Sequence, residues 1–356
     1  MGEKMKEKMK AAVWHGVKDV RVEDVPLPEI GDHDVLVAVH WAGICGSDLH
    51  EYQEGPVFIP VDKADELTGG HAPLTMGHEF SGVIVSVGDK VSAGHEVGQR
   101  VVVNPTITHG NKVDNLDVYD GYSFIGLSRD GGFTKYVSVP ETNIYDVPDA
   151  LPLRKAALIE PTAVGVQAVK EGGLTFGQTV VVYGAGPIGV LVAAAAKAAG
   201  ATKIVVVDLS AVRLEKALEM GATDVINAGE TDAVEAVHAI LPEGADVVFE
   251  VAGVQKTFEQ AIDSTRPRGT MVVVSIFAHP ISFDPMQLIN AGIHITSSIA
   301  YSRETFQQTV DLVASGQLDV EPVITKEIVL DDIVTDGFEA LSSDKSQAKI
   351  LVDLAE

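Results

Sequence analysis

Residues 179–189 read TVVVYGAGPIG, and the next apolar run, KIVVVD, ends at Asp208. A run of β-branched residues that leads into three spaced glycines is typical of a strand followed by a phosphate-binding turn and a helix. An Ala-rich helix over 187–199 and a second strand over 203–208 complete one β-α-β unit. This stretch predicts an α/β fold with a doubly wound parallel sheet and a dinucleotide at the end of its first strand.

Each residue of the turn has an expected task. Gly184 permits the tight turn, Gly186 lets the backbone approach a pyrophosphate, and Gly189 lets helix and strand pack closely. Pro187 and Ile188 begin the helix, whose free N–H groups are expected to bind the pyrophosphate. Glycines in this spacing also occur in ordinary turns, so the prediction depends on the strand and helix around them.

Asp208 ends the second strand, where a carboxylate is expected to bind ribose hydroxyls. Because a carboxylate repels a 2′-phosphate, we expect NAD rather than NADP. Arg213 is a candidate for contact with the adenine or ribose. Two alternatives stay open: Asp208 as a helix-capping or turn residue, and Arg213 on a solvated helix face.

Strands and helices continue to alternate up to about residue 300, with a helix over 211–220 and the strand segments DVVFEVAG, TMVVVSIF and HITSSIA. Ligands of such sheets bind at the carboxyl ends of the strands. The residues expected beside the nicotinamide ring are therefore Val251, Ala252, Gly253, Ser275, Ile276 and Phe277.

The rest of the chain has a different pattern of predicted secondary structure. Residues 10–150 form short β segments separated by Gly, Pro and Asp, which predicts a mainly β domain with ligand residues in its loops. The tail contains a helix over 305–315 and two further strands, and we expect it to return to this domain. The predicted domains are 1–157 with 301–356, and 158–300.

Composition excludes several classes of protein. The net charge of −25 argues against a nucleic-acid partner, and no run reaches the roughly 18 apolar residues of a membrane span. One cysteine excludes an intrachain disulfide and a four-cysteine zinc site, and fits a reducing cytosol. The first ten residues lack the apolar core of a signal peptide. We expect a cytoplasmic protein with a small-molecule substrate.

Residues 43–50, GICGSDLH, follow a strand and are expected to form a loop, and Gly77-His78-Glu79 precedes the strand FSGVIVSVG. The thiolate of Cys45, the imidazole of His78 and the carboxylate of Glu79 suit Zn²⁺, with Glu160 as a further candidate ligand. An isolated cysteine is more often an apolar filler, and chance His-Glu pairs are common. A dinucleotide fold downstream favours the metal, because oxidation of an alcohol benefits from a Lewis acid.

Five segments resemble, in order, the medium-chain dehydrogenase/reductase superfamily: GICGSDLH, MGHEFSGVIVSVG, GGFTKYV, EPTAVG and YGAGPIG. Within it the chain is similar to the polyol branch, which contains sorbitol and 2,3-butanediol dehydrogenases. The resemblance implies a Rossmann domain, a GroES-like catalytic domain, a zinc- and NAD-dependent alcohol dehydrogenase, and a homodimer or homotetramer.

The resemblance also implies roles for single residues. Cys45, His78 and Glu79 correspond to zinc ligands, and Glu160 to a ligand that binds directly or through water. Ser47 and His50 correspond to a proton relay. Asp48 would orient His78, with an Asx-turn role as the alternative.

The chain departs from the superfamily in one lobe. Many members hold a structural zinc with four cysteines there, whereas residues 106–122 contain none. We therefore expect one catalytic zinc per chain and no structural zinc. His109, Asp114, Asp117 and Asp120 are an alternative metal site, which we interpret as a solvated acidic loop instead.

Residues 299–301, Ile-Ala-Tyr, bear on the substrate. Sorbitol-type enzymes have a similar stretch, but with an arginine in place of Ala300. A small apolar residue favours a short diol, hence interconversion of 2,3-butanediol with acetoin, and of acetoin with diacetyl. The alternatives are a sorbitol/L-iditol or L-threonine 3-dehydrogenase, or a nucleotide-binding protein of crystallin-like or regulatory type. Intact candidate ligands argue against the last.

Overall fold

The computed structural model describes residues 8–110, 117–344 and 346–355. The chain divides into two compact units. Unit 1 contains residues 1–160, 306–314 and 324–356, and unit 2 contains residues 161–305 and 315–323. The units differ from the predicted domains mainly at 315–323, because the short helix Glu321–Val323 packs on two helices of unit 2.

Unit 2 contains the predicted doubly wound sheet, whose strands run in the order β13-β12-β11-β14-β15-β16 with every pairing parallel. The order reverses beside β11, the strand of the glycine-rich turn, as in dinucleotide-binding sheets. The strands are β11 Thr179–Tyr183, β12 Lys203–Asp208, β13 Asp224–Asn227, β14 Ala245–Glu250, β15 Thr265–Val273 and β16 His294–Ser297.

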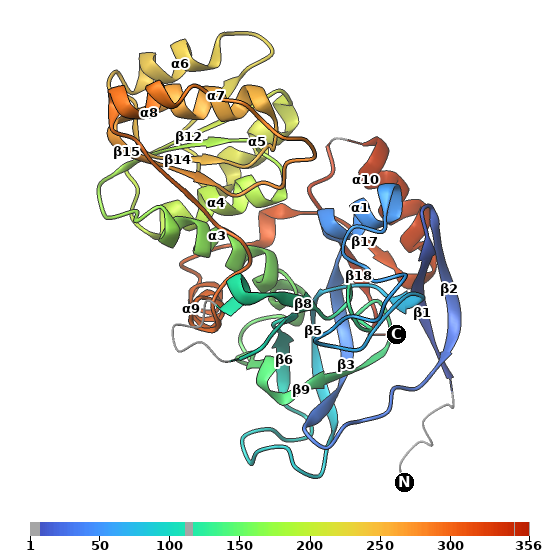
Figure 1. Ribbon diagram of the computed structural model, residues 1–356. Helices are drawn as coiled ribbons and strands as arrows, with labels where there is room; N and C mark the ends of the chain where they lie inside the picture. The colour runs from blue at the N-terminus through green and yellow to red at the C-terminus, as the bar shows by residue number, and fades with distance from the viewer. Residues whose placement is uncertain (1–7, 111–116, 345, 356) are drawn as a thin grey trace. The chain divides into compact units, whose positions relative to one another are not determined.

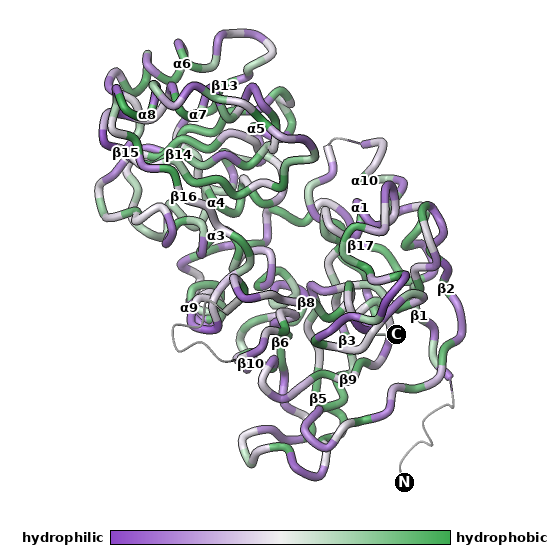
Figure 2. The backbone as a smooth tube through the Cα atoms, in the orientation of Figure 1, coloured by the Kyte–Doolittle hydropathy of each residue, from purple (hydrophilic) through white to green (hydrophobic). Residues whose placement is uncertain are grey.

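Helices cover both faces of this sheet, with α4 on one side and α7 on the other (Figure 1). Because both faces are covered, the middle of a strand can be apolar on both sides, as in β11, where Val180, Val181 and Val182 are all buried. Figure 2 shows β14 as largely hydrophobic. The predicted helices over 187–199 and 211–220 are confirmed. The helices are α3 Ile159–Glu171, α4 Pro187–Ala198, α5 Ala211–Met220, α6 Ala233–Ile240, α7 Gln255–Ser264 and α8 Pro285–Ala291.

Unit 1 is mainly β, as expected. One sheet has the order β2-β1-β4, and a larger one the order β10-β6-β5-β3-β18-β17, with β9 also paired to β3. Its strands are β1 Lys8–Gly16, β2 Asp19–Pro26, β3 Asp34–Gly43, β4 Leu74–Thr75, β5 Glu79–Val87, β6 Arg100–Val103, β9 Tyr136–Pro140, β10 Ile144–Asp146, β17 Ile324–Val329 and β18 Lys349–Asp353.

The tail returns to unit 1 as expected, because β18 lies between β3 and β17 in the larger sheet. The predicted helix over 305–315 is present as α9, Arg303–Ala314, and its Phe306 ring packs against Tyr145 of β10 at a tilt of 52°, with ring centroids 4.7 Å apart. The remaining helices are α1 Gly46–Glu54, α2 Leu153–Ala156, a π-helical turn Ile333–Glu339 and α10 Ala340–Ser343. Among the described residues, no helix has the length and apolar character to cross a membrane.

Candidate functional site

Cys45, His78 and Glu79 form a compact group in unit 1. One potential ligand atom from each residue lies within 4.8 Å of the other two. His78 and Glu79 are buried, and Cys45 is partly exposed. A thiolate, an imidazole and a carboxylate at this spacing fit Zn²⁺, and three protein ligands leave a position open for a substrate oxygen.

The structure corrects one local prediction, since Cys45 begins a helix instead of lying in a loop. Cys45 is the N-cap of α1, and its N–H donates to Asp48 Oδ2 at 3.0 Å. An acidic side chain at the third helical position satisfies an N–H group at the helix start and stabilises the helix dipole. Ser47, Asp48 and His50 consequently lie on a rigid element directly after the thiol.

Glu79 begins β5, opposite Gly43 of β3. A Cβ atom at Gly43 would overlap the Glu79 carboxylate, so only glycine leaves room for this side chain. Gly43, two residues before Cys45, therefore makes space for the Glu79 side chain.

Lys349 of β18 contacts this group of residues, and the sequence did not predict it. Its Nζ lies 2.7 Å from both carboxylate oxygens of Glu79 and donates to the Ile44 carbonyl at 3.1 Å. Both side chains are buried. Burial would lower the pKa of Lys349, but the negative charges of Glu79 and Cys45 outweigh it and raise the pKa above its ordinary value. A lysine inside the apolar run AKILVDL was the available signal.

His78 lies between Asp48 and Ser47. Its Nδ1 is 3.3 Å from Asp48 Oδ1, and its Nε2 is 3.1 Å from Ser47 Oγ. Burial would lower the pKa of His78, but the charges of Asp48 and Cys45 outweigh it and raise the pKa well above its ordinary value.

The Asp48–His78 pair tests whether the group fits a metal. Both Asp48 Oδ1 and His78 Nδ1 are buried without a hydrogen bond among the described residues. A metal on Nε2 would leave the proton on Nδ1, facing this carboxylate, as metal-bound imidazoles commonly require. The residues present therefore fit zinc.

His50 and Glu160 occupy different surroundings. His50 is exposed on α1, whereas Glu160 is buried in the first turn of α3. Glu160 lies outside the group of three, although its negative charge contributes to the raised pKa of Lys349.

The cysteine-free lobe is held by hydrogen bonds. Its strands β7 Thr106–Thr108 and β8 Tyr122–Phe124 form a hairpin, and the Asn143 amide donates to the carbonyls of Asn104 and Thr106 at 2.6 and 2.9 Å. Ser123 donates to Asp65 at 2.8 Å. Residues 111–116, including Asp114, lie outside the described residues, as does the Asp117 side chain. In the described part of the lobe, His109 and Asp120 belong to no group with metal-ligand spacing.

The glycine-rich turn has the predicted geometry in unit 2. Gly184 has φ +108°, and a Cβ at Gly189 would overlap the Gly184 carbonyl oxygen. Gly186 is the N-cap of α4, and a Cβ there would meet no atom of the described residues within 4 Å, so a ligand can approach its backbone.

Asp208 supports this turn from the end of β12. Its Oδ2 accepts from the Ala185 N–H at 2.7 Å, and its Oδ1 from the Ser210 N–H at 2.9 Å. Ser210 in turn caps α5, which carries Arg213 in its first turn. Asp208 thus lies against the dinucleotide turn, where a ribose hydroxyl would be bound.

The segments 251–253 and 275–277 follow β14 and β15 and lie together. A Cβ at Gly253 would be 2.8 Å from the Ile276 carbonyl oxygen, and one at Gly184 3.1 Å from the Val251 carbonyl carbon. Three predicted cofactor-binding segments therefore meet at one edge of the sheet. Ala300 is buried further along the chain, with φ +49°.

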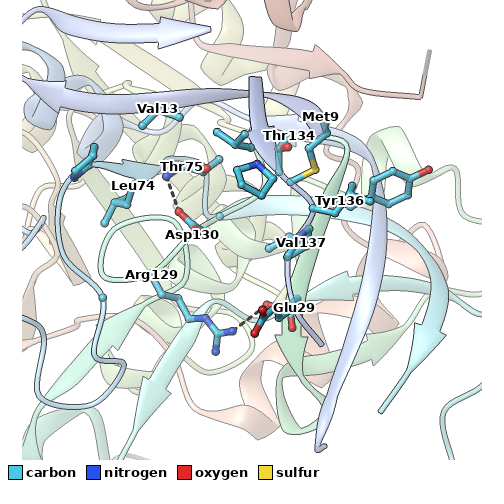
Figure 3. A pocket seen from close by; sticks show the side chains of 18 of the residues that line it. Met9, Val13, Glu29, Leu74, Thr75, Arg129, Asp130, Thr134, Tyr136 and Val137 are labelled. Atoms are coloured by element: carbon cyan, nitrogen blue, oxygen red, sulfur yellow. Dashed lines mark hydrogen bonds between the residues drawn. The ribbon is translucent and has the colours of Figure 1, made fainter. Parts of the chain in front are cut away.

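Unit 1 also contains a pocket of about 520 Å³ between β1, β2, β4 and residues 129–138 (Figure 3). Asp130 accepts from the Thr75 N–H at 2.8 Å, and Arg129 donates to the Ser138 carbonyl at 3.1 Å. The residues that line it include no predicted site residue. These two hydrogen bonds join Asp130 and Arg129 to the backbone of β4 and β9.

Comparison with known proteins covers almost the whole chain. Residues 31–149 match the alcohol dehydrogenase GroES-like domain, and residues 187–315 match zinc-binding dehydrogenase. The (R,R)-butanediol dehydrogenase of Bacillus subtilis is 45% identical over 97% of this chain and 99% of that protein.

Solved structures of similar proteins have the same fold over nearly the whole chain. The crystal structure of 2R,3R-butanediol dehydrogenase from Bacillus subtilis has a TM-score of 0.92 and 43% identity, covering 97% of this chain and 99% of the other. A zinc-binding dehydrogenase from Sinorhizobium meliloti bound to NADP has a TM-score of 0.87 and 30% identity, covering 98% and 100%.

Proposed function

Because this chain belongs to the zinc-binding alcohol dehydrogenases with a GroES-like domain, we propose that it interconverts (R,R)-2,3-butanediol and acetoin with NAD(H). Family membership makes it an oxidoreductase that uses zinc and a nicotinamide dinucleotide on a small-molecule alcohol. The compact group of Cys45, His78 and Glu79, with His78 and Glu79 buried, is the observation that carries the proposal for this chain. The same proposal includes reduction of diacetyl to acetoin.

The proposed mechanism assigns separate tasks to the residues of unit 1. Zinc held by Cys45, His78 and Glu79 would supply a Lewis acid for the substrate hydroxyl, and a dinucleotide would supply the hydride acceptor. Ser47 accepts the hydroxyl proton while it releases its own proton toward His50, and His50, exposed on the same helix, then loses a proton to solvent. Asp48 orients the His78 ring, and Glu160 would bind the metal either directly or through a water molecule.

The preference for NAD and the number of zinc ions are part of the proposal. The carboxylate of Asp208 beside the glycine-rich turn supports NAD, because it would repel a 2′-phosphate. The absence of cysteine from residues 106–122 supports a single catalytic zinc, and the hydrogen bonds from Asn143 to the Asn104 and Thr106 carbonyls stabilise the start of this lobe. We also propose that the protein is cytoplasmic. Cys45 is a free cysteine, and a thiol that serves as a metal ligand must stay reduced, as thiols do in the cytosol.

We further propose assembly into a homodimer or homotetramer along β16. This strand is the edge of its sheet, and Ile295 on it and Ile289 on α8 are exposed. An exposed edge strand presents unpaired N–H and C=O groups that can pair with a strand of a second chain, and exposed isoleucines beside it would be buried by that pairing. Light scattering on the purified protein should give the mass of two or four chains, and a monomer would refute this part.

Activity with a panel of alcohols tests the function. Under saturating NAD we expect (R,R)-2,3-butanediol to be oxidised faster than sorbitol, L-iditol or L-threonine. Faster oxidation of sorbitol would refute the proposed substrate, and no turnover of any diol by zinc-loaded protein would favour a non-enzymatic role.

Cys45→Ser tests the metal centre. We expect zinc content and activity to fall to background while the circular dichroism spectrum stays that of the wild type, because the metal is catalytic. Simultaneous loss of the fold would contradict this reasoning.

A further inference from the structure

Glu250 is a fully buried carboxylate at the carboxyl end of β14, and none of the predicted site roles uses it. Its Oε1 accepts from the N–H groups of Ala252 and Gly253 at 3.0 and 2.9 Å, and from the Thr257 hydroxyl at 2.7 Å. Its Oε2 accepts from the Ser275 hydroxyl. Such donors stabilise a buried carboxylate without a cation.

These donors come from three separate segments. Ala252 and Gly253 belong to the loop after β14, Thr257 to the first turn of α7, and Ser275 to the loop after β15. The main chain adds to the same connection, because the Glu250 carbonyl accepts from the N–H groups of Val274 and Ser275 at 2.9 and 3.3 Å. Glu250 therefore joins the two loops that are expected beside the nicotinamide ring.

The loop after β14 also contacts the glycine-rich turn. The Val251 N–H donates to the Tyr183 carbonyl at 2.9 Å, directly before Gly184. Val251 is therefore tied to β11 by a main-chain bond that does not involve the Glu250 side chain, whereas the N–H groups of Ala252 and Gly253 donate to the Glu250 carboxylate.

We infer that Glu250 is a positioning residue that fixes the backbone of residues 251–253 and 275–277 to receive the nicotinamide half of NAD(H). The inference rests on the proposed function, because that function places the nicotinamide at these loops. It predicts a selective effect: loss of Glu250 weakens binding of the whole dinucleotide, whereas the adenosine half, bound at the glycine-rich turn and Asp208, keeps its affinity.

Asp246 offers a matched control at the other end of the same strand. Its carboxylate accepts from the Thr179 N–H and hydroxyl, both at 2.8 Å, and from Arg266 at 2.7 Å. It therefore also ties neighbouring strands together, but at the amino ends, away from the carboxyl edge where ligands bind.

The experiment measures dissociation constants of NADH and AMP by calorimetry, using the full-length, zinc-loaded protein. For Glu250→Ala we expect the dissociation constant of NADH to rise about tenfold, which corresponds to about 1.4 kcal/mol of binding free energy, and the dissociation constant of AMP to stay unchanged. Glu250→Gln should stay within about threefold of wild type, because its amide can accept from the loop N–H groups and donate to Ser275. Asp246→Ala should leave both constants unchanged.

The inference is overturned if Glu250→Ala binds NADH like wild type, or if NADH and AMP weaken equally. It is also overturned if Asp246→Ala reproduces the selective loss. If Glu250→Ala does not fold, Ser275→Ala removes one connection and should still weaken NADH selectively. Wild-type protein that fails to bind NADH would refute the proposed cofactor as well, whereas binding without diol oxidation would refute only the proposed substrate.

Discussion

Replacement of Lys349 by methionine should destabilise unit 1 far more than the same replacement of Lys10. In both pairs the lysine Nζ lies 2.7 Å from both oxygens of one carboxylate, Glu79 for Lys349 and Asp331 for Lys10. The pairs differ in exposure: the side chains are 2% and 0% exposed in the first, and 57% and 58% in the second. Burial is therefore the variable that the comparison isolates.

The two costs follow from what each replacement leaves behind. Methionine at 349 leaves the Glu79 carboxylate buried without its counter-charge, which costs about 3–5 kcal/mol. The Ile44 carbonyl also loses its donor. Methionine at 10 removes a solvent-screened pair worth about 0–1 kcal/mol.

Urea unfolding of the zinc-free proteins measures both changes, since a bound cation would partly replace the charge of Lys349. The tryptophans, Trp14 and Trp41, both lie in unit 1, so their fluorescence reports its unfolding. Adding Glu79→Gln to Lys349→Met should recover most of the lost stability, because no uncompensated charge then remains. The reasoning is refuted if the Lys349 and Lys10 variants lose equal stability.

Three further predictions concern other parts of the chain. Asp208→Ser should raise the ratio of kcat/KM for NADP to that for NAD, because the repelling carboxylate is gone; an unchanged ratio in steady-state kinetics would contradict its role. Gly189→Val should abolish NADH binding in a fluorescence titration, because its side chain would overlap the Gly184 carbonyl; wild-type affinity would show that the turn adapts. Burial would raise the pKa of Asp65, but hydrogen bonds, from Ser123 first, outweigh it and lower the pKa. The ionised Asp65 carboxylate therefore contributes its full share of the free energy of unfolding above the unfolded pKa of about 3.9, and this share disappears as the pH falls through the lower folded pKa. In urea titrations, Asp65→Asn should therefore cost more stability at pH 7 than near pH 3.

Local patterns predicted much of this protein. The Val-rich runs and spaced glycines of 179–189 predicted the parallel sheet and its turn, because both faces of such a strand are buried and the turn needs Gly184 in a positive-φ conformation. The start of α1 was missed, because the capping interaction of Asp48 was interpreted as a turn or an orienting role, whereas one side chain serves both the helix and His78.

The amino-acid sequence by itself determined helices α4, α5 and α9, the Val-rich parallel strands, the glycine-rich turn and the residue types able to hold zinc, because these depend on periodicity and short spacings. Only the tertiary structure decided which charges meet. Lys349 and Glu79 are 270 residues apart and pair because β18 returns to the sheet of β3 and β5. Glu250 collects donors from two loops because parallel strands end at one edge. Such contacts depend on how strands are ordered in a sheet, which local periodicity does not encode.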